Sequence, residues 1–254
     1  MPTAITRKVS PTITRCELTH LQRELIDVSR ALAQHEAYEQ ALADLGCRVV
    51  SLAAEPGLPD SVFIEDTAVV LDQLAVVMRP GAASRRAETP AVARVLAEYR
   101  PIATIEAPGT LDGGDVLRVG RRVFVGLSVR SNREGIEQLR TLLSPHGYEV
   151  EALLVTGCLH LKSAVTQVAS EVILLNPEWV NPAAFDRYKR IELDPSEPYA
   201  ANGLLIGDAV LYPTAFPRTA ARLDGAGIRL VPVDVSELAK AEGAVTCCSL
   251  ILEH

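Results

Sequence analysis

Thr67-Ala-Val-Val-Leu71, Asp72-Gln73 and Leu74-Ala-Val-Val-Met78 follow one another as an apolar run, two polar residues and a second apolar run. Two valine-rich runs joined by so short a polar connection predict a tight β-hairpin. The pattern then predicts a helix near residues 90–98 and another strand at 102–105. The stretch therefore predicts one strand–strand–helix–strand unit.

The same order of elements recurs along the chain at a period of roughly 40 to 48 residues, which is typical of a repeat architecture. Further hairpins are expected at 115–126, 163–175 and 203–212, and a fifth pairs 248–252 with an N-terminal strand at 4–9. Helices are expected near 134–143, 182–188 and 219–223, and closing strands at 150–155 and 228–232. Such a unit cannot bury its apolar faces alone, whereas a closed ring of five can. We therefore expect an α/β fold of five ββαβ repeats with pseudo-fivefold symmetry, in a single domain spanning residues 1–254.

The longest helix signal runs from Leu21 to Leu45, where apolar residues recur at spacings of three and four. Thr19 is the expected N-cap, and Gly46 follows the last apolar turn. His35 lies on the apolar stripe, so we interpret it as a packed core histidine. A strand at 48–52 follows the helix.

Composition describes an ordinary globular chain of 254 residues, of which 48% are hydrophobic and 22% charged. The net charge of −7 and the absence of a basic run argue against a nucleic-acid partner. The N-terminus does not resemble a signal peptide, and no apolar window is long enough to cross a bilayer. The sequence leaves the oligomeric state open, a homo-oligomer included.

Five cysteines, an odd and scattered set, favour reduced thiols in a cytoplasm. No CxxC pair or histidine cluster is present, so no metal site is expected. Cys247 and Cys248 are adjacent at the start of an expected strand at 249–252, and neighbouring strand residues point to opposite faces. One thiol is therefore a candidate nucleophile, and the other is expected to pack in the core.

Polar residues stand at the start of each expected hairpin. If the units surround a common axis, these positions converge on it and share one cavity. They are Asp60 with Glu65-Asp66, Asp112-Gly-Gly-Asp115, His160-Leu-Lys162, Tyr199-Ala-Ala-Asn202 and Thr246-Cys247-Cys248.

Each of these groups also has a purely structural explanation. Glu65 and Asp66 could be charges that protect a strand edge, and Asp112-Gly-Gly-Asp115 could be a simple turn. His160 could be packed between two leucines. Arg85 and Arg130, in polar loops, could be solvated cations. Their coincidence at one point of the repeat favours a functional site.

The chemistry that suits this set is specific. A cysteine and a histidine together supply a nucleophile and a general acid/base. Several carboxylates in the same cavity would bind a flat cation such as a guanidinium, and they would raise the pKa of the thiol in the empty site. We therefore expect the cationic substrate to help generate the thiolate. Arginines at the mouth would hold a carboxylate, and the substrate class is then an amino acid with a guanidinium side chain.

Seven short motifs in order connect the chain to a known family. The chain resembles the dimethylarginine dimethylaminohydrolases of the guanidine-modifying, or pentein, superfamily over nearly its whole length. The resemblance implies a five-bladed α/β propeller. The motifs are 60–66 (DSVFIED), 79–86 (RPGAASRR), 111–115 (LDGGD), 124–130 (FVGLSVR), 159–162 (LHLK), 196–202 (SEPYAAN) and 245–249 (VTCCS).

The resemblance also implies a role for each candidate residue. Cys247 becomes the nucleophile and His160 the general acid/base, with Asp112 beside them and Cys248 as a neighbour. Leu18 matches a residue of the loop that closes over the site, although the 16–20 segment matches only loosely. The remaining substrate-binding residues are the carboxylates and arginines Asp60, Glu65, Asp66, Arg85 and Arg130.

The implied reaction is hydrolysis of Nω-methylated arginine to citrulline through a covalent thiouronium on Cys247, without a metal or organic cofactor. The alternatives are an arginine deiminase or another guanidine hydrolase, an amidinotransferase, and, from a different class, a non-enzymatic binding protein on the same fold. The sequence does not rank methylated above unmethylated arginine, because a methyl group contributes only about 1–3 kcal/mol of discrimination.

Overall fold

Five three-stranded sheets form the framework of the computed structural model, which describes residues 1–253. In each sheet the first two strands of a unit pair antiparallel and the third pairs parallel with the second. The sheets are β3 (Ala68–Val70), β4 (Ala75–Val77) and β5 (Ile102–Thr104); β6 (Val116–Val119), β7 (Arg122–Leu127) and β8 (Glu149–Leu154); β9 (Val165–Ala169), β10 (Val172–Leu175) and β11 (Lys189–Glu192); β12 (Leu204–Ile206), β13 (Ala209–Pro213) and β14 (Arg229–Val233); and β15 (Ser249–Leu252), β1 (Thr3–Arg7) and β2 (Arg48–Leu52).

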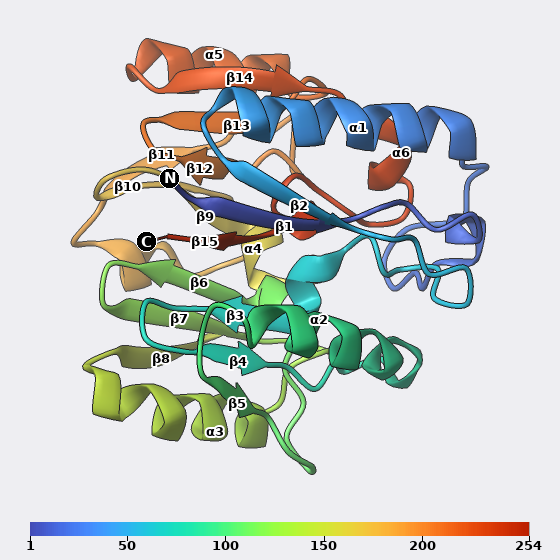
Figure 1. Ribbon diagram of the computed structural model, residues 1–254. Helices are drawn as coiled ribbons and strands as arrows, with labels where there is room; N and C mark the ends of the chain where they lie inside the picture. Colours follow the sequence, from blue (N-terminus) through green and yellow to red (C-terminus); the bar gives the residue numbers. More distant parts are fainter. Residues whose placement is uncertain (254) are drawn as a thin grey trace.

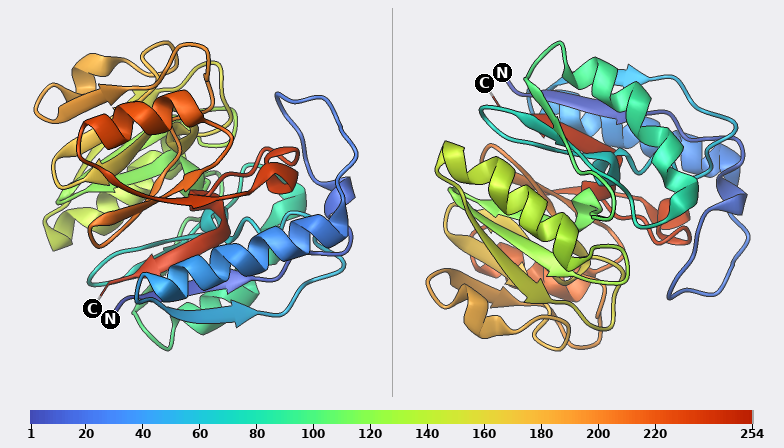
Figure 2. Two further views of the ribbon diagram at one scale, coloured as in Figure 1. Left: turned by 90° about the horizontal axis from the view of Figure 1, so that it is seen from above. Right: turned by 90° about the horizontal axis from the view of Figure 1, so that it is seen from below.

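The last sheet closes the ring, because β15 from the end of the chain pairs with β1 from its beginning. The two chain ends therefore lie side by side (Figure 1), and the blue and red segments remain neighbours in both views of Figure 2. A cavity of about 210 Å³ is lined by residues of β3, β6, β9, β12 and β15, the first strand of every sheet. The predicted five-bladed α/β propeller is confirmed.

Helices connect the second and third strands of four units. They are α1 (Val28–Asp44), α2 (Thr89–Leu96), α3 (Arg133–Leu143) and α5 (Pro217–Gly225), while the shorter α4 (Leu161–Ala164) and α6 (Ser236–Ala239) lie in connections between sheets. The middle strands are the most buried, and β1, β4 and β13 have no exposed residue. Among residues 1–253, no helix has the length and apolar character to cross a bilayer.

The helix predicted from Leu21 is shorter than expected. It begins at Val28, and Asp27 rather than Thr19 is the N-cap, with its side chain accepting the Arg30 N–H at 3.1 Å. The prediction was wrong here because backbone amides before residue 22 bind acidic side chains elsewhere, which holds the segment out of a helix. The other end is as predicted, with Gly46 in the left-handed region at φ +85°. His35 is fully buried, also as predicted.

Two further predictions differ from the structure. The helix expected at 182–188 is only a 3₁₀ turn, Pro182–Phe185. It is followed by β11, the closing strand that the repeat requires but for which the sequence pattern indicated no range. The two adjacent cysteines lie on a 3₁₀ turn, Thr246–Cys248, and not on the strand that follows it. Both are short segments in which the apolar spacing of a helix or strand cannot be told from that of a tight turn.

Candidate active site

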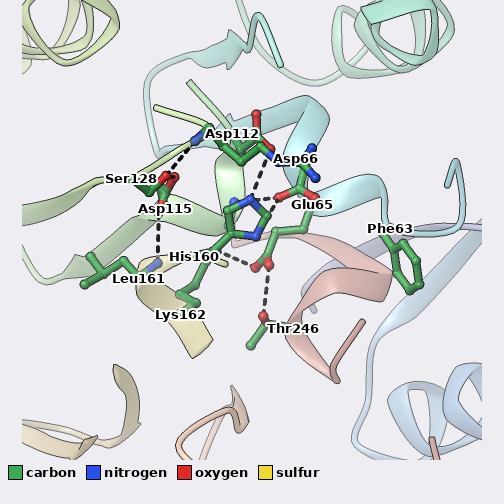
Figure 3. A network of polar contacts seen from close by, with 12 residues as sticks. Phe63, Glu65, Asp66, Asp112, Asp115, Ser128, His160, Leu161, Lys162 and Thr246 are labelled. Carbon is green, nitrogen blue, oxygen red and sulfur yellow. Dashed lines mark hydrogen bonds and ion pairs between the residues drawn. The ribbon is translucent and has the colours of Figure 1, made fainter. Parts of the chain in front are cut away.

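Short turns place the polar residues at one end of the central axis. The 3₁₀ turns Ile64–Thr67, Gly113–Asp115 and Thr246–Cys248, together with α4, each directly precede the first strand of a sheet. Because those strands share the central axis, the turns meet at one end of it. Figure 3 shows the ring of His160, the residue directly before α4, among the carboxylates of Asp66 and Asp112. The predicted convergence is confirmed for the positions of Asp66, Asp112, His160 and Cys247. The prediction of one shared cavity was wrong for Tyr199 and Asn202, which line a separate cavity.

His160 is surrounded by acidic groups. Its Nε2 lies 3.0 Å from Asp112 Oδ2, and its Nδ1 lies 3.8 Å from Asp66 Oδ1. Burial alone would lower the pKa of His160, but Asp66, Asp112 and Asp115 outweigh it and raise the pKa to about 9. The imidazole is therefore protonated at neutral pH and able to act as an acid.

The backbone at Gly114 makes this close approach possible. A Cβ there would lie 2.6 Å from His160 Nδ1 and 2.7 Å from Asp66 Oδ1. The Gly114 N–H also donates to Asp66 Oδ1 at 2.9 Å. The Asp112-Gly-Gly-Asp115 segment is thus a turn, as its composition indicates. Its backbone at Gly114 also packs directly against the His160 ring and the Asp66 carboxylate.

The two adjacent thiols have different surroundings. Cys247 is partly exposed and lines a cavity together with His160, whereas Cys248 is fully buried in the apolar cluster around α1. Burial, followed by the charges of Glu65 and Asp66, raises the pKa of the Cys247 thiol. The two thiols are placed as predicted, one facing the cavity and one packed in the core.

The cavity that Cys247 and His160 share measures about 20 Å³, room for about one water molecule. Four predicted substrate-binding residues line it: Asp60, Asp66, Arg85 and Arg130. A guanidinium amino acid is much larger than this space. The loop of residues 16–27, called the covering loop below, contributes Glu17 to the cavity wall and bonds to Arg130 through Thr19.

Both arginines are buried rather than solvated, with exposed fractions of 4% for Arg85 and 8% for Arg130. Arg85 forms ion pairs with Asp66 and Glu88 and donates to the Phe63 carbonyl at 2.9 Å. Arg130 donates to the Thr19 hydroxyl at 3.0 Å. Because Thr19 is neutral, the Arg130 guanidinium is the better placed of the two to receive a substrate carboxylate.

Three predicted residues lie outside the lining of this cavity. Asp112 is fully buried behind His160 and also accepts the Gly81 N–H at 2.8 Å. Glu65 forms an ion pair with Lys162 and accepts the Thr246 hydroxyl at 2.9 Å, so it holds the turn of the nucleophile. Leu18 packs against the apolar cluster around α1. Glu65 also faces the central cavity between the sheets.

Sequence reasoning assigned no role to six residues of the cavity wall: Glu17, Phe63, Leu159, Ala241, Glu242 and Gly243. Phe63 lies within the 60–66 motif, and the glycine at Gly243 admits its ring, since a Cβ there would lie 2.1 Å from a ring carbon. No spacing in the sequence singles out Glu17 or Glu242, because their positions depend on contacts between distant segments.

Asp66, Asp112 and His160 are the described residues whose ligand atoms lie close enough to hold a metal ion, within 4.8 Å of one another. Their atoms are already bonded to one another and to Arg85. The expectation of a metal-free site stays a prediction.

Comparison with known proteins places this geometry in a family. A family model described as eukaryotic N,N-dimethylarginine dimethylhydrolase matches residues 17–190. A Streptomyces coelicolor protein named N(G),N(G)-dimethylarginine dimethylaminohydrolase is 39% identical over 253 residues, covering 99% of this chain and 97% of its own. The chain belongs to the dimethylarginine dimethylaminohydrolase family.

Two solved structures of dimethylarginine dimethylaminohydrolases have the same fold. One is the Pseudomonas aeruginosa protein, a cysteine-to-serine variant in complex with citrulline, with a TM-score of 0.94, 33% identity and 98% coverage of both chains. The other is a histidine-to-glycine variant as an adduct with S-methyl-L-thiocitrulline, with a TM-score of 0.94, 33% identity and coverage of 99% and 100%.

Proposed function

We propose that this chain hydrolyses Nω-methylated L-arginines, asymmetric dimethylarginine and monomethylarginine, to L-citrulline and dimethylamine or methylamine. The observation that carries the proposal is the shared cavity of Cys247 and His160, walled by carboxylates and by two guanidinium groups. Family membership supports it, and so do the citrulline and thiocitrulline ligands of the two related structures. The enzyme is then a C–N hydrolase acting on a small molecule.

The charged groups of the cavity wall are assigned to the two ends of the substrate. Asp60 and Asp66 face the guanidinium, and Arg130, assisted by Arg85, binds the substrate carboxylate. Arg85 has a second task, since its ion pair with Asp66 and the charge of His160 outweigh burial and keep the pKa of that carboxyl below its usual range. Asp66 is therefore ionised when the substrate arrives. Glu65 acts through Thr246 on the nucleophile turn, and Leu18 belongs to the covering loop.

The first chemical stage follows from the two shifted pKa values. In the free enzyme the thiol of Cys247 is neutral and His160 is an imidazolium. A guanidinium placed beside Cys247 offsets the charges of Glu65 and Asp66, so the thiol loses its proton to solvent on binding. The thiolate attacks the guanidinium carbon, and the C–N bond to the methylated nitrogen breaks as His160 gives that nitrogen its proton. A covalent thiouronium remains on the sulfur.

The second stage returns the enzyme to its starting form. His160, now neutral, takes a proton from a water molecule that attacks the thiouronium carbon. The C–S bond then breaks, the remaining hydroxyl proton of that water passes to the sulfur, and citrulline is released. Covalent catalysis helps because guanidinium resonance makes direct attack by water slow, and two smaller barriers replace one large barrier. Asp112 holds the imidazole during both proton transfers.

A citrulline assay on purified protein tests the proposal. Asymmetric dimethylarginine, monomethylarginine and arginine are compared, with Cys247→Ser as the nucleophile variant and Cys248→Ala as its matched control. We expect turnover of the methylated substrates that is lost in Cys247→Ser and retained in Cys248→Ala. Turnover of arginine alone would identify a deiminase instead. No turnover by the folded protein would reject the proposal in favour of amidino transfer or a binding role.

We also propose that the enzyme acts as one α/β-propeller domain in the cytoplasm, without a nucleic-acid or membrane partner. All five cysteines are free, which suits a reducing compartment. The net charge of −7 disfavours polyanions. Size-exclusion chromatography with light scattering, with and without a reductant, tests whether the reduced monomer or a homo-oligomer is the native form.

A further inference from the structure

Glu242 joins two parts of the chain that are more than two hundred residues apart. Its carboxylate accepts the backbone N–H groups of three consecutive residues in the covering loop: Thr19 at 3.0 Å, His20 at 2.5 Å and Leu21 at 2.6 Å. Backbone amides bound to a carboxylate are charge-assisted donors, which are the stronger class of hydrogen bond. One side chain thus holds the whole tip of the loop.

The backbone of Glu242 is in a conformation that a glutamate rarely adopts. Its φ is +59°, in the left-handed region, at the point where the chain leaves α6. The Gly243 N–H bonds back to the Leu238 carbonyl at 3.1 Å, as in a helix end that usually has a glycine at the left-handed position. The fold of this turn would favour glycine at residue 242, so the glutamate side chain needs another explanation.

Glu242 also lies at a boundary between two cavities. It lines the catalytic cavity, and it lines a larger cavity of about 230 Å³, together with Leu159 and Gly243 in both cases. His20 and Leu21 of the loop tip line the larger cavity. The bonds between Glu242 and the loop therefore form at the edge where the catalytic cavity would open.

Two of the other attachments of the loop near the catalytic cavity use groups that the substrate would need. The Glu17 N–H donates to Asp60 at 3.2 Å, and Thr19 accepts from Arg130 at 3.0 Å. A bound guanidinium competes for Asp60, and a bound carboxylate competes for Arg130. Once substrate occupies the site, the bonds of Glu242 to the loop do not compete with it. Three other bonds share this property: the Ser84 hydroxyl to Glu17, and, nearer α1, the Asp27 N–H to Glu237 and Lys240 to the Leu25 carbonyl. Among these, Glu242 is the one that holds the loop tip at residues 19–21.

We propose that Glu242 is a positioning residue that keeps the 16–27 loop closed over bound substrate through the backbone amides of Thr19, His20 and Leu21. The kinetic part of this inference rests on the proposed function. The attachment of the loop itself does not, because it consists of hydrogen bonds within this chain.

Glu242→Gly tests the role without endangering the fold. Glycine has no Cβ and adopts a positive φ freely, so the melting temperature should stay the same or rise. Glu171→Gly is a matched control, because Glu171 also has a positive φ, 56°, and is exposed in the hairpin between β9 and β10. Glu242→Gln keeps the backbone and the length of the side chain but exchanges one acceptor oxygen for an NH₂ group.

Limited trypsin cleavage at Arg23, an exposed residue of the loop, reports loop opening directly. In saturating citrulline we expect cleavage of Glu242→Gly at least about tenfold faster than that of the wild type, Glu242→Gln in between, and Glu171→Gly unchanged. Equal cleavage rates in Glu242→Gly and the wild type, with and without citrulline, would overturn the proposal.

The kinetic constants KM and kcat provide a second test of the role of Glu242. Because the catalytic groups are untouched, Glu242→Gly should raise KM for dimethylarginine at least about tenfold and change kcat less than threefold, since substrate escapes before it reacts. A KM within twofold of the wild type contradicts the role in substrate retention. Faster loop cleavage in a protein that turns over no methylarginine would reject the proposed function while upholding the attachment of the loop by Glu242.

Discussion

The imidazole of His160 and the thiol of Cys247 hold one proton more in the free enzyme than the reaction needs. The raised pKa values of both groups keep the pair as thiol and imidazolium at neutral pH, whereas attack requires thiolate and imidazolium. Because the pKa of the thiol is raised further, the first proton to leave the pair is that of His160, whose pKa is about 9. This order of titration sets the pH dependence of the enzyme.

We predict that kcat/KM rises about tenfold per pH unit below the first pKa of the pair and levels off near pH 9. Asp112→Asn removes a carboxylate that raises the pKa of His160, so the rise should move to lower pH by about one unit, and kcat should fall about 10-fold to 100-fold. Profiles of kcat/KM between about pH 6 and 10 measure both effects. If kcat/KM rose over the same pH range in Asp112→Asn and in the wild type, Asp112 would not be a group that raises the pKa of His160.

Gly114 should be as sensitive as the catalytic residues themselves. In Gly114→Ala the new methyl group would meet His160 Nδ1 at 2.6 Å, so the ring has to shift, and we predict a loss of kcat of about 100-fold or more. Gly225→Ala is the control, because a Cβ at Gly225 has nothing within 4 Å. Comparable kcat values in the two variants would show that His160 tolerates displacement.

At the scale of elements, Asp115 ties three segments together. One oxygen accepts the Leu161 N–H at 2.9 Å, at the start of α4 beside His160. The other accepts the hydroxyls of Ser128 and Ser131, each at 2.6 Å, in the loop that carries Arg130. The buried carboxylate of Asp115 therefore fixes the position of His160, the predicted acid/base, relative to Arg130, the predicted carboxylate-binding residue.

Asp115→Ala leaves these buried donors without their acceptor, and we predict a loss of about 2–4 kcal/mol in the free energy of unfolding. Asp72→Ala removes an exposed ion pair with Arg118 and should cost less than about 1 kcal/mol. Urea unfolding followed by the fluorescence of the single tryptophan, Trp179, measures both. A loss in Asp115→Ala no larger than in Asp72→Ala would contradict the bridging role.

At the scale of the whole molecule, a closed set of contacts joins four of the five units around the axis. Lys162 pairs with Glu65, Glu65 accepts the Thr246 hydroxyl at 2.9 Å, and Asn202 donates to Thr246 and to the Lys162 carbonyl, both at 3.0 Å. Each of these residues directly precedes the first strand of its sheet or lies beside it. The ring of sheets is thus held together by polar groups as well as by apolar packing.

Lys162→Met leaves Glu65 buried without its cation, and we predict a loss of about 3–5 kcal/mol in the free energy of unfolding. Adding Glu65→Gln removes the unpaired charge, so the double variant should be more stable than Lys162→Met alone. A thermodynamic cycle of the single and double variants measures the coupling. Strict additivity of the two changes would mean that the pair contributes nothing to the closure of the ring.

The regular parts of the fold could be predicted because their patterns are local. The hairpins at 68–77 and 116–127 and the helix at 133–143 follow from valine-rich runs, tight connections and apolar spacing. The start of α1 could not be predicted in this way. Leu21 and Leu25 extend the apolar stripe, yet Leu25 is 87% exposed, because the amides of its loop bind Glu242 and Asp60 instead of one another.

In the candidate site, too, some features could be predicted from the sequence and others could not. The positions of Cys247, His160 and Asp112 relative to the hairpins are a property of the repeat, which places its first strands on one axis, so residue order alone predicts that they converge. The partners of Arg85, the place of Glu65 beside Lys162 and the hold of Glu242 on the loop depend on which side chains meet across the ring. Such contacts join segments up to 223 residues apart, and no local spacing encodes them, because packing between units decides which charges are buried together.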